Sequence, residues 1–200
     1  MSSSSWDNYN NEVRQRSLIR FVIGLIPRVY FYLKFSFIRY IARRMGGVIG
    51  EGVMMPLSLA RKANSNLEIG DHSIVGTSQL DLRCKVKIGK NVIITSPTCR
   101  VITLSHNIDS PQWEHKRYGI EIEDYVWIPN DVLILPSCRK IGYGAVVGSG
   151  SVVVIDVEPM SVVGGNPAKE FKKRACVHSE HLMEQSQTAD LKYYWKAYLK

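Results

Sequence analysis

A six-residue repeat of aliphatic side chains limits most strongly how this chain can fold. An aliphatic residue opens each block of the stretch 122–158, and successive openings are six residues apart except for one step of seven. These openings are Ile122, Ile128, Ile134, Ile141, Val147 and Val153. The fifth residue of each block is small or β-branched, and turn-forming Gly, Asn, Asp and Pro lie between. A period of six matches neither a helix nor an alternating strand. It predicts short strands joined by tight bends, as in a parallel β-helix.

The same period is present, less regularly, in residues 46–101. Ile69 and Val75 are six apart, and so are Ile88 and Ile94. The repeat places His72 at a turn and Cys138 in the interior, where a thiol behaves as a small hydrophobic group. The period fails in residues 102–120, so we expect a polar loop that leaves the solenoid, the kind of segment in which functional residues gather.

The repeat carries a resemblance to a known family. V-W-I-P-N-D-V-L-I-L-P-S (126–137) resembles the V-W-I-G-x-x-V-x-I-L-P-G motif of the hexapeptide-repeat acyltransferases. G-A-V-V-G-S-G-S-V-V-V (144–154) and S-V-V-G-G-N-P-A-K (161–169) are similar to that family's closing segments. The resemblance implies an all-β fold, the left-handed parallel β-helix, with acetyl-CoA as co-substrate. It also implies a homotrimer whose active sites lie at subunit interfaces.

Outside the β-helix, the sequence indicates helical segments at both ends. We expect an N-terminal tail and amphipathic helical segment (1–45), a β-helix domain (46–174) with an expelled loop at 102–120, and a C-terminal helical tail (175–200). Residues 1–17 are polar and are interpreted as a loose tail or short cap. Residues 18–45 are apolar but interrupted by basic residues, and a break is expected near Pro27. In the tail, apolar residues from Leu191 to Leu199 follow helical spacing.

The net charge of the chain indicates which classes of binding partner to expect. Lys plus Arg number 26 and Asp plus Glu number 18, which gives a net charge of +8 and suits an anionic partner. No helix-turn-helix or zinc pattern accompanies it, so nucleic acid is not expected. The basic residues of 18–45 fall on about half of a helix circumference. Either this helix packs on protein, or it lies on an anionic membrane surface with its basic residues toward the headgroups.

Two further features bear on location and metals. No signal peptide is recognised, and the four cysteines form no C-x-x-C pair, which fits a reducing cytoplasm, with peripheral contact at the inner face of the membrane as the alternative. A zinc carbonic anhydrase of the same fold needs two histidines five positions apart, and no H-x-x-x-x-H is present. No metal is therefore expected.

The expelled loop holds the candidate catalytic residue. S-H-N-I-D-S-P (105–111) resembles the S-H-D-x-x-S-P of polysaccharide O-acetyltransferases. The resemblance implies that His106 is the general base, a role to which imidazole is suited near neutral pH. Asp109, Glu114 or a main-chain carbonyl would orient the ring, and the sequence leaves the choice open. His115 either contacts the acceptor or is inert.

The family's binding residues carry over to several positions. Those implied for the pantetheine are Trp127, Asn130, Ser149 and Val154, and those implied for the nucleotide phosphates are Lys169 and Lys172. Pro129 and Val154 depart from the family's usual Gly and Thr. The candidate acceptor-binding residues are Gln79 and Asp81, with Arg83 beside them, and Asp109 of the loop.

These features favour an acetyl-CoA-dependent O-acetyltransferase that acts on a sugar of a surface polysaccharide or its precursor. Alternatives are an N-acetyltransferase of a nucleotide-linked amino sugar and an enzyme that acetylates a small xenobiotic. A catalytically silent β-helix binding module is the alternative outside enzymes, and it needs neither His106 nor the two lysines.

Overall fold

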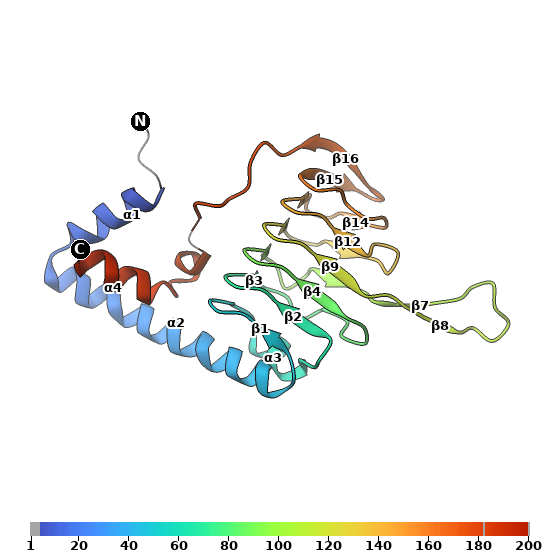
Figure 1. Ribbon diagram of the computed structural model, residues 1–200, viewed down its shortest axis with the longest axis horizontal. Coiled ribbons are helices and arrows are strands. Elements are labelled where there is room, and N and C mark those ends of the chain that lie inside the picture. The colour runs from blue at the N-terminus through green and yellow to red at the C-terminus, as the bar shows by residue number, and fades with distance from the viewer. Residues whose placement is uncertain (1–4, 182, 200) are drawn as a thin grey trace. The chain divides into compact units, whose positions relative to one another are not determined.

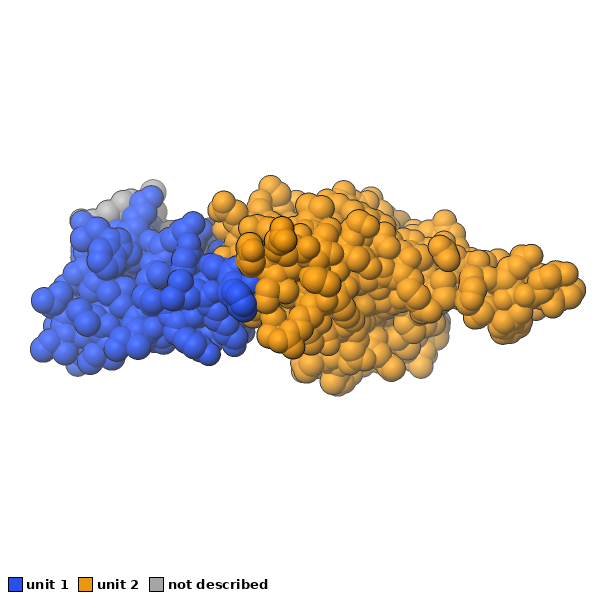
Figure 2. Space-filling view, turned by 90° about the horizontal axis from the view of Figure 1, so that it is seen from below, with its two compact units in different colours: residues 1–37, 178–200 blue, residues 38–177 orange. Residues whose placement is uncertain are grey.

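The computed structural model describes residues 5–181 and 183–199 and divides into two compact units (Figures 1 and 2). The helical unit contains residues 1–37 and 178–200, and the solenoid unit contains residues 38–177. The sequence-based boundaries at 45 and 174 stay a prediction.

Three sheets form the sides of the solenoid, and the chain visits them in turn. The five-stranded sheet has the order β1 (Val48–Ile49), β2 (Leu67–Ile69), β4 (Val86–Ile88), β9 (Ile120–Ile122), β12 (Lys140–Ile141). The three-stranded sheet contains β6 (Arg100–Val101), β11 (Leu133–Ile134) and β14 (Val152–Val153). The six-stranded sheet contains β3 (Ile74–Val75), β5 (Ile93–Ile94), β10 (Trp127–Ile128), β13 (Val146–Val147), β15 (Ser161–Gly165) and β16 (Ala168–Lys173). Neighbouring strands are parallel except for β16, which pairs antiparallel with β15. The predicted left-handed parallel β-helix is confirmed.

The repeat positions account for the interior. Each opening aliphatic residue between 122 and 158 is buried, and so is each fifth residue, because both point into the coil. Ile122 and Val126, for example, are both 0% exposed. Cys138 is buried as predicted, and desolvation raises the pKa of its thiol to about 12.

The corners of the coils require special backbone conformations. His72, Asn91, Tyr125 and Gly144 have φ values of 58°, 53°, 60° and 65°. This left-handed region is open to glycine and, at single positions, to residues such as Asn. His72 is therefore a turn residue, as predicted.

The expelled loop is an antiparallel hairpin of β7 (Leu104–His106) and β8 (His115–Arg117). Its base is closed by the Tyr118 N–H, which donates to the Thr103 carbonyl at 2.9 Å. The pattern predicted an excursion, and the pairing of the two strands gives it a defined structure.

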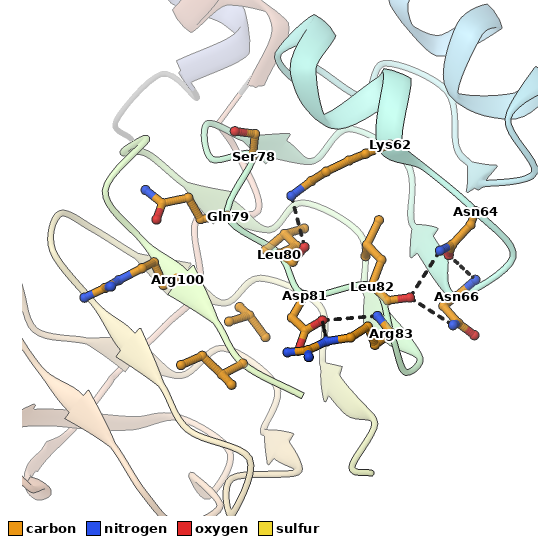
Figure 3. Close-up of a pocket in the computed structure, with 12 residues that line it drawn as sticks. Lys62, Asn64, Asn66, Ser78, Gln79, Leu80, Asp81, Leu82, Arg83 and Arg100 are labelled. Atoms are coloured by element: carbon orange, nitrogen blue, oxygen red, sulfur yellow. Dashed lines mark hydrogen bonds and ion pairs between the residues drawn. The ribbon is translucent and has the colours of Figure 1, made fainter. Parts of the chain in front are cut away.

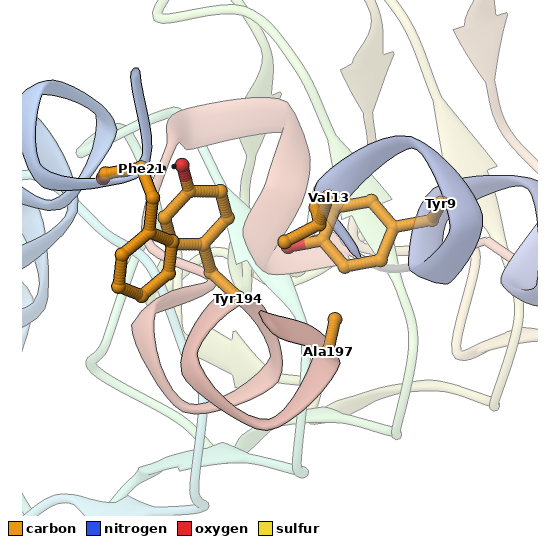
Figure 4. Close-up of a cluster of buried hydrophobic side chains, with 5 residues drawn as sticks. All are labelled: Tyr9, Val13, Phe21, Tyr194 and Ala197. Atoms are coloured by element: carbon orange, nitrogen blue, oxygen red, sulfur yellow. Dashed lines mark hydrogen bonds between the residues drawn. The ribbon is translucent and has the colours of Figure 1, made fainter. Parts of the chain in front are cut away.

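The helical unit has a small aromatic core. It contains α1 (Ser5–Arg14), most of α2 (Leu18–Arg44), the 3-10 helix η1 (Met183–Gln187) and α4 (Leu191–Leu199). The short helix α3 (Leu57–Lys62) belongs to the solenoid unit. The buried cluster of the helical unit consists of Tyr9, Val13, Phe21, Tyr194 and Ala197 (Figure 4).

The expectation of a loose tail is wrong for residues 5–14, which form α1. Tyr9 and Val13 lie one helical turn apart and bury their side chains in the cluster. The Tyr9 hydroxyl also donates to Asp190 at 2.5 Å. These partners are about 180 positions away, and local sequence cannot signal them.

The expected break near Pro27 is also wrong, because α2 is one helix of 27 residues that contains Pro27. A proline removes one helical hydrogen bond, and the buried Phe21 and Phe35 hold the turns on both sides of it.

Three of the basic residues expected to face outward from α2 bind protein groups. Arg28 pairs with Asp190 at 3.0 Å. Arg39 donates to the Val53 carbonyl at 3.1 Å, and Arg43 Nε donates to the Ile49 carbonyl at 2.9 Å. The interpretation that this basic face meets headgroups is therefore wrong for these three residues.

Candidate functional site

His106 lies at the end of β7, directly opposite His115 of β8. The two imidazole rings are 4.4 Å apart between centroids, and the Trp113 ring stacks on His106 at 5.2 Å. The His106 side chain is half-buried among these rings. The hairpin thus collects both loop histidines and the loop tryptophan in one cluster.

A main-chain carbonyl orients the His106 ring. Nδ1 lies 2.9 Å from the Trp113 carbonyl oxygen. A carbonyl only accepts, so Nδ1 carries the proton in this contact, and in the neutral ring Nε2 has the free lone pair. Of the three orienting groups left open by the sequence, the contact is made by the main-chain carbonyl, while the Asp109 side chain is exposed.

A pocket of about 860 Å³ lies in the solenoid unit beside the segment that leads into the hairpin (Figure 3). Gln79, Asp81 and Arg83 line it, as do the cations Lys62 and Arg100. A neighbouring cavity of about 300 Å³ shares Gln79 and Arg100. The candidate acceptor residues Gln79 and Asp81 therefore border one hollow that is rich in cationic side chains.

Asp81 ties this pocket to the hairpin. Arg83 donates to both carboxylate oxygens at 2.8 Å, and the Thr103 N–H donates to Oδ2 at 3.1 Å. The Arg83 hydrogen bonds, helped by Thr103, hold the pKa of Asp81 well below its usual value. Thr103 directly precedes β7, so Asp81 anchors the base of the hairpin.

Lys62 projects into the pocket from the end of α3. Its ammonium donates to the Leu80 carbonyl at 3.1 Å (Figure 3). Burial lowers the pKa of Lys62, and nearby Asp81 opposes that shift. The sequence carried no signal for Lys62. Arg100 occupies the outward first position of β6 and could have been found from the strand period.

The residues carried over for the cofactor lie in the C-terminal coils. Trp127 is exposed on β10 and in register with Val146 of the next coil. Asn130 and Ser149 share one corner, where the Gly150 N–H donates to the Asn130 carbonyl at 3.0 Å. Val154 directly follows β14 and is half-buried.

Lys169 and Lys172 are exposed on β16, in register with Gly164 and Val162 of β15. Val162 is in turn in register with Val146, and Val146 with Trp127. One sheet therefore carries Trp127 and both lysines.

The hairpin and the cofactor residues Asn130 and Ser149 leave the coils at different corners. The hairpin follows β6 and precedes β9, between the three- and five-stranded sheets. Asn130 and Ser149 lie between the six- and three-stranded sheets. Among the described residues, no hydrogen bond or ring contact joins His106 to a cofactor residue. The three-stranded sheet thus separates the hairpin from Asn130 and Ser149 within one chain, whereas Val154 follows β14 at the same corner as the hairpin.

Among the described residues, no group of three or more His, Cys, Asp or Glu side chains is arranged to hold a metal ion. The coils, the hairpin and the exposed rows together define a β-helix protein of the hexapeptide-repeat class.

Comparisons with known proteins agree with this class. A hexapeptide-repeat-containing acetyltransferase from Vibrio cholerae has a similar structure, with a TM-score of 0.61 and 25% identity over 84% of this chain and 88% of that one. A putative colanic acid biosynthesis acetyltransferase, WcaF, from Escherichia coli strain K12 is 29% identical over 136 residues, which cover 68% of this chain and 74% of that protein. No protein-family model matches the chain.

A shorter match is closer in sequence. A chloramphenicol acetyltransferase from Klebsiella aerogenes is 57% identical over 49 residues, 24% of this chain and 23% of that protein. The chain spans less than a quarter of the length of such relatives. In sequence and in fold, the chain is similar to hexapeptide-repeat acetyltransferases.

Proposed function

We propose that this protein is an acetyl-CoA-dependent O-acetyltransferase that acts on a sugar of a surface polysaccharide or its precursor. The observation that carries the proposal is the hydrogen bond from His106 Nδ1 to the Trp113 carbonyl. It leaves Nε2 as the free base of a ring that is held in place by stacking. The similarity to WcaF supports a sugar as the acceptor.

The proposed reaction is a direct transfer. His106 Nε2 removes the proton of the acceptor hydroxyl as its oxygen attacks the acetyl carbonyl carbon. The new C–O bond forms, the C–S bond of the thioester breaks, and the proton passes from the imidazolium to the leaving thiolate. No serine or cysteine nucleophile is required.

The residues proposed for acetyl-CoA are Trp127, Asn130, Ser149 and Val154, with Lys169 and Lys172 toward the phosphates. The exposure of both lysines on β16 supports charge-assisted contacts with an anion. The acceptor is proposed to bind near Gln79 and Asp81, where the 860 Å³ pocket opens beside the hairpin.

The separation of the hairpin from the cofactor residues supports a site shared between subunits. We expect a homotrimer in which the His106 hairpin of one subunit faces the cofactor residues of a neighbour, since closed cyclic symmetry is the usual arrangement of soluble oligomers. Light scattering on the active protein measures this, and an active monomer would contradict it.

His106→Ala tests the catalytic role. The variant should lose on the order of 10²–10⁴ in rate, the usual cost of removing a general base. Acetyl-CoA affinity and thermal stability should stay unchanged, because the side chain fills no position inside a coil.

The matched control is His115→Ala, which removes the neighbouring ring and should cost much less. Transfer is measured as thioester consumption over a panel of sugar hydroxyl, amino-sugar and xenobiotic acceptors. If His115→Ala is inactive while His106→Ala is active, the assignment of the base is wrong. If amino sugars alone accept acetyl, the product is an amide and the O-acetyltransferase proposal fails.

Lys169→Ala combined with Lys172→Ala tests the cofactor assignment. Charge-assisted hydrogen bonds typically contribute about 1.5–3 kcal/mol each, so the KM for acetyl-CoA should rise about tenfold or more while kcat changes less. Lys173→Ala is the control on the same strand, because its ammonium already pairs with Glu170 at 3.0 Å. A change confined to the acceptor KM would assign the two lysines to the other substrate.

A further inference from the structure

The helical unit exposes an unusual apolar surface along α2. Leu18, Val22, Ile26, Val29, Leu33 and Phe37 follow one another at steps of four, four, three, four and four residues, so they form one stripe. Their exposed fractions lie between 40% and 68%. We call these six residues the α2 stripe. Exposed apolar patches of this extent mark interaction sites.

Helix α2 exposes its apolar residues to solvent, which is the reverse of an ordinary surface helix. The side of α2 that turns inward carries Phe21, which is buried, and Arg28, whose charge pairs with Asp190. The side that faces solvent carries the aliphatic residues. An amphipathic surface helix normally buries its apolar face and exposes its polar one, and the α2 stripe has the reverse arrangement.

Helix α4 extends the apolar surface. An apolar groove of about 480 Å³ runs between α2 and α4, lined by Leu25, Val29, Leu191, Lys192 and Trp195. The Trp195 ring and the Leu199 side chain are 50% and 69% exposed on α4. An exposed tryptophan with an apolar body and a polar N–H suits the boundary between lipid and water.

Positive charges border this surface. Lys34 is exposed on α2 one turn before Phe37 of the stripe, and Lys192 and Lys196 are exposed on α4. Neither α2 nor α4 contains an acidic residue. An apolar stripe flanked only by cations is complementary to an anionic lipid surface. Two copies of the stripe packed together would instead bring like charges to one another.

We propose that the α2 stripe and α4 bind the surface of an anionic membrane, with α2 lying in the interface. By length and composition α2 could cross a bilayer, but only one of its faces is apolar to solvent. Its other face is packed against α4 and the charged Asp190, which a spanning helix would carry into hydrocarbon. The proposal is independent of the acetyltransferase assignment.

Vesicle flotation of the full-length protein tests it. Wild type should float with vesicles of phosphatidylcholine mixed with phosphatidylglycerol. It should bind pure phosphatidylcholine less, and added sodium chloride should weaken the binding. Failure to bind the mixed vesicles, or equal binding to both compositions, would overturn the proposal.

Two variants separate the apolar and the charged contributions. Ile26→Gln with Leu33→Gln should lower the partition coefficient by about tenfold or more, because each replaces an inserted aliphatic group. Lys192→Gln with Lys196→Gln should remove most of the preference for phosphatidylglycerol. Val48→Gln is the matched control, since Val48 is exposed to a similar extent (58%) on β1 of the solenoid unit, and it should bind as wild type does.

Self-association is measured in parallel by sedimentation velocity. If Ile26→Gln with Leu33→Gln dissociates an assembly of the wild type and leaves flotation unchanged, the stripe binds a second copy and the membrane proposal is wrong. The acetyl-transfer assay on soluble acceptors should be the same for these variants and wild type, because they lie outside the residues proposed for the reaction.

Discussion

The solenoid unit and the helical unit treat similar aliphatic residues in opposite ways. In the coils, Ile122, Ile128 and Ile134 are each at most 1% exposed. On α2, Ile19, Ile23 and Ile26 are between 61% and 73% exposed. The difference teaches that burial here follows the architecture: every coil covers the next, whereas a helix can hide only one side on a small neighbour.

The two units also differ in what holds them together. The coils rely on aliphatic stacking and parallel backbone ladders. The helical unit relies on an aromatic cluster and on a buried ion pair, with Arg28 over the Tyr194 ring at 3.8 Å and against Asp190. The units should therefore fail under different substitutions.

Removing Arg28 should have the largest effect. Arg28→Ala leaves the fully buried Asp190 without its counter-ion, and breaking a buried pair typically costs about 3–5 kcal/mol. Hydrogen exchange followed by mass spectrometry should show lost protection in α1 and α4 and retained protection in the coils. Arg20→Ala removes an equal charge from the exposed side of the same helix and should change little. Loss of protection in both units together would refute their independence.

A substitution in the coils should reverse this pattern. A Cβ at Gly89 would lie 2.7 Å from the backbone nitrogen of Asp124 in the next coil, so Gly89→Ala must push two coils apart. Overpacking of this kind costs about 1–3 kcal/mol, and the thermal midpoint of the coils should fall. Gly164→Ala is the control, because the nearest atom there belongs to the exposed Phe171 ring, which can move.

The smallest of these effects concerns the junction of a coil with the hairpin. Asp81→Asn keeps the shape of the side chain and removes the charge that Arg83 binds. We expect kcat to fall about tenfold through misplacement of His106, with a smaller rise in the acceptor KM because Asp81 also lines the proposed acceptor pocket. Gln79→Ala, which lines the same pocket without holding the hairpin, should raise the acceptor KM instead. A rise in acceptor KM for Asp81→Asn, with kcat unchanged, would show that Asp81 binds substrate.

The charge of Asp81 determines the pH range over which it stabilises the junction of the coil with the hairpin. The pKa of Asp81 is depressed in the folded protein. The contribution of its charge to folding stability is therefore complete above the unfolded pKa of about 3.9. It is lost only as pH falls through the lower folded value. Activity changes near neutral pH therefore report on other groups.

The local repeat was sufficient to predict the coils, because each six-residue block encodes its own burial. The loss of the six-residue period also located the hairpin. The position of His72 within its repeat block placed it at a turn, where its φ value is 58°. The local sequence could not predict α1, whose Tyr9 meets Asp190 from the other end of the chain. It left open whether the basic residues of α2 meet protein or a membrane, because the partners of Arg28 and Arg39 are not visible in their own segment.

The hairpin begins and ends at adjacent points of the same coil. Thr103 and Tyr118 are hydrogen-bonded to each other, and Ile120 resumes the ladder with Val86 as if nothing intervened. A segment that begins and ends at adjacent points can lengthen, shorten or be exchanged without shifting any repeat after it. Changes confined to this insertion therefore leave the register of the coils as it is.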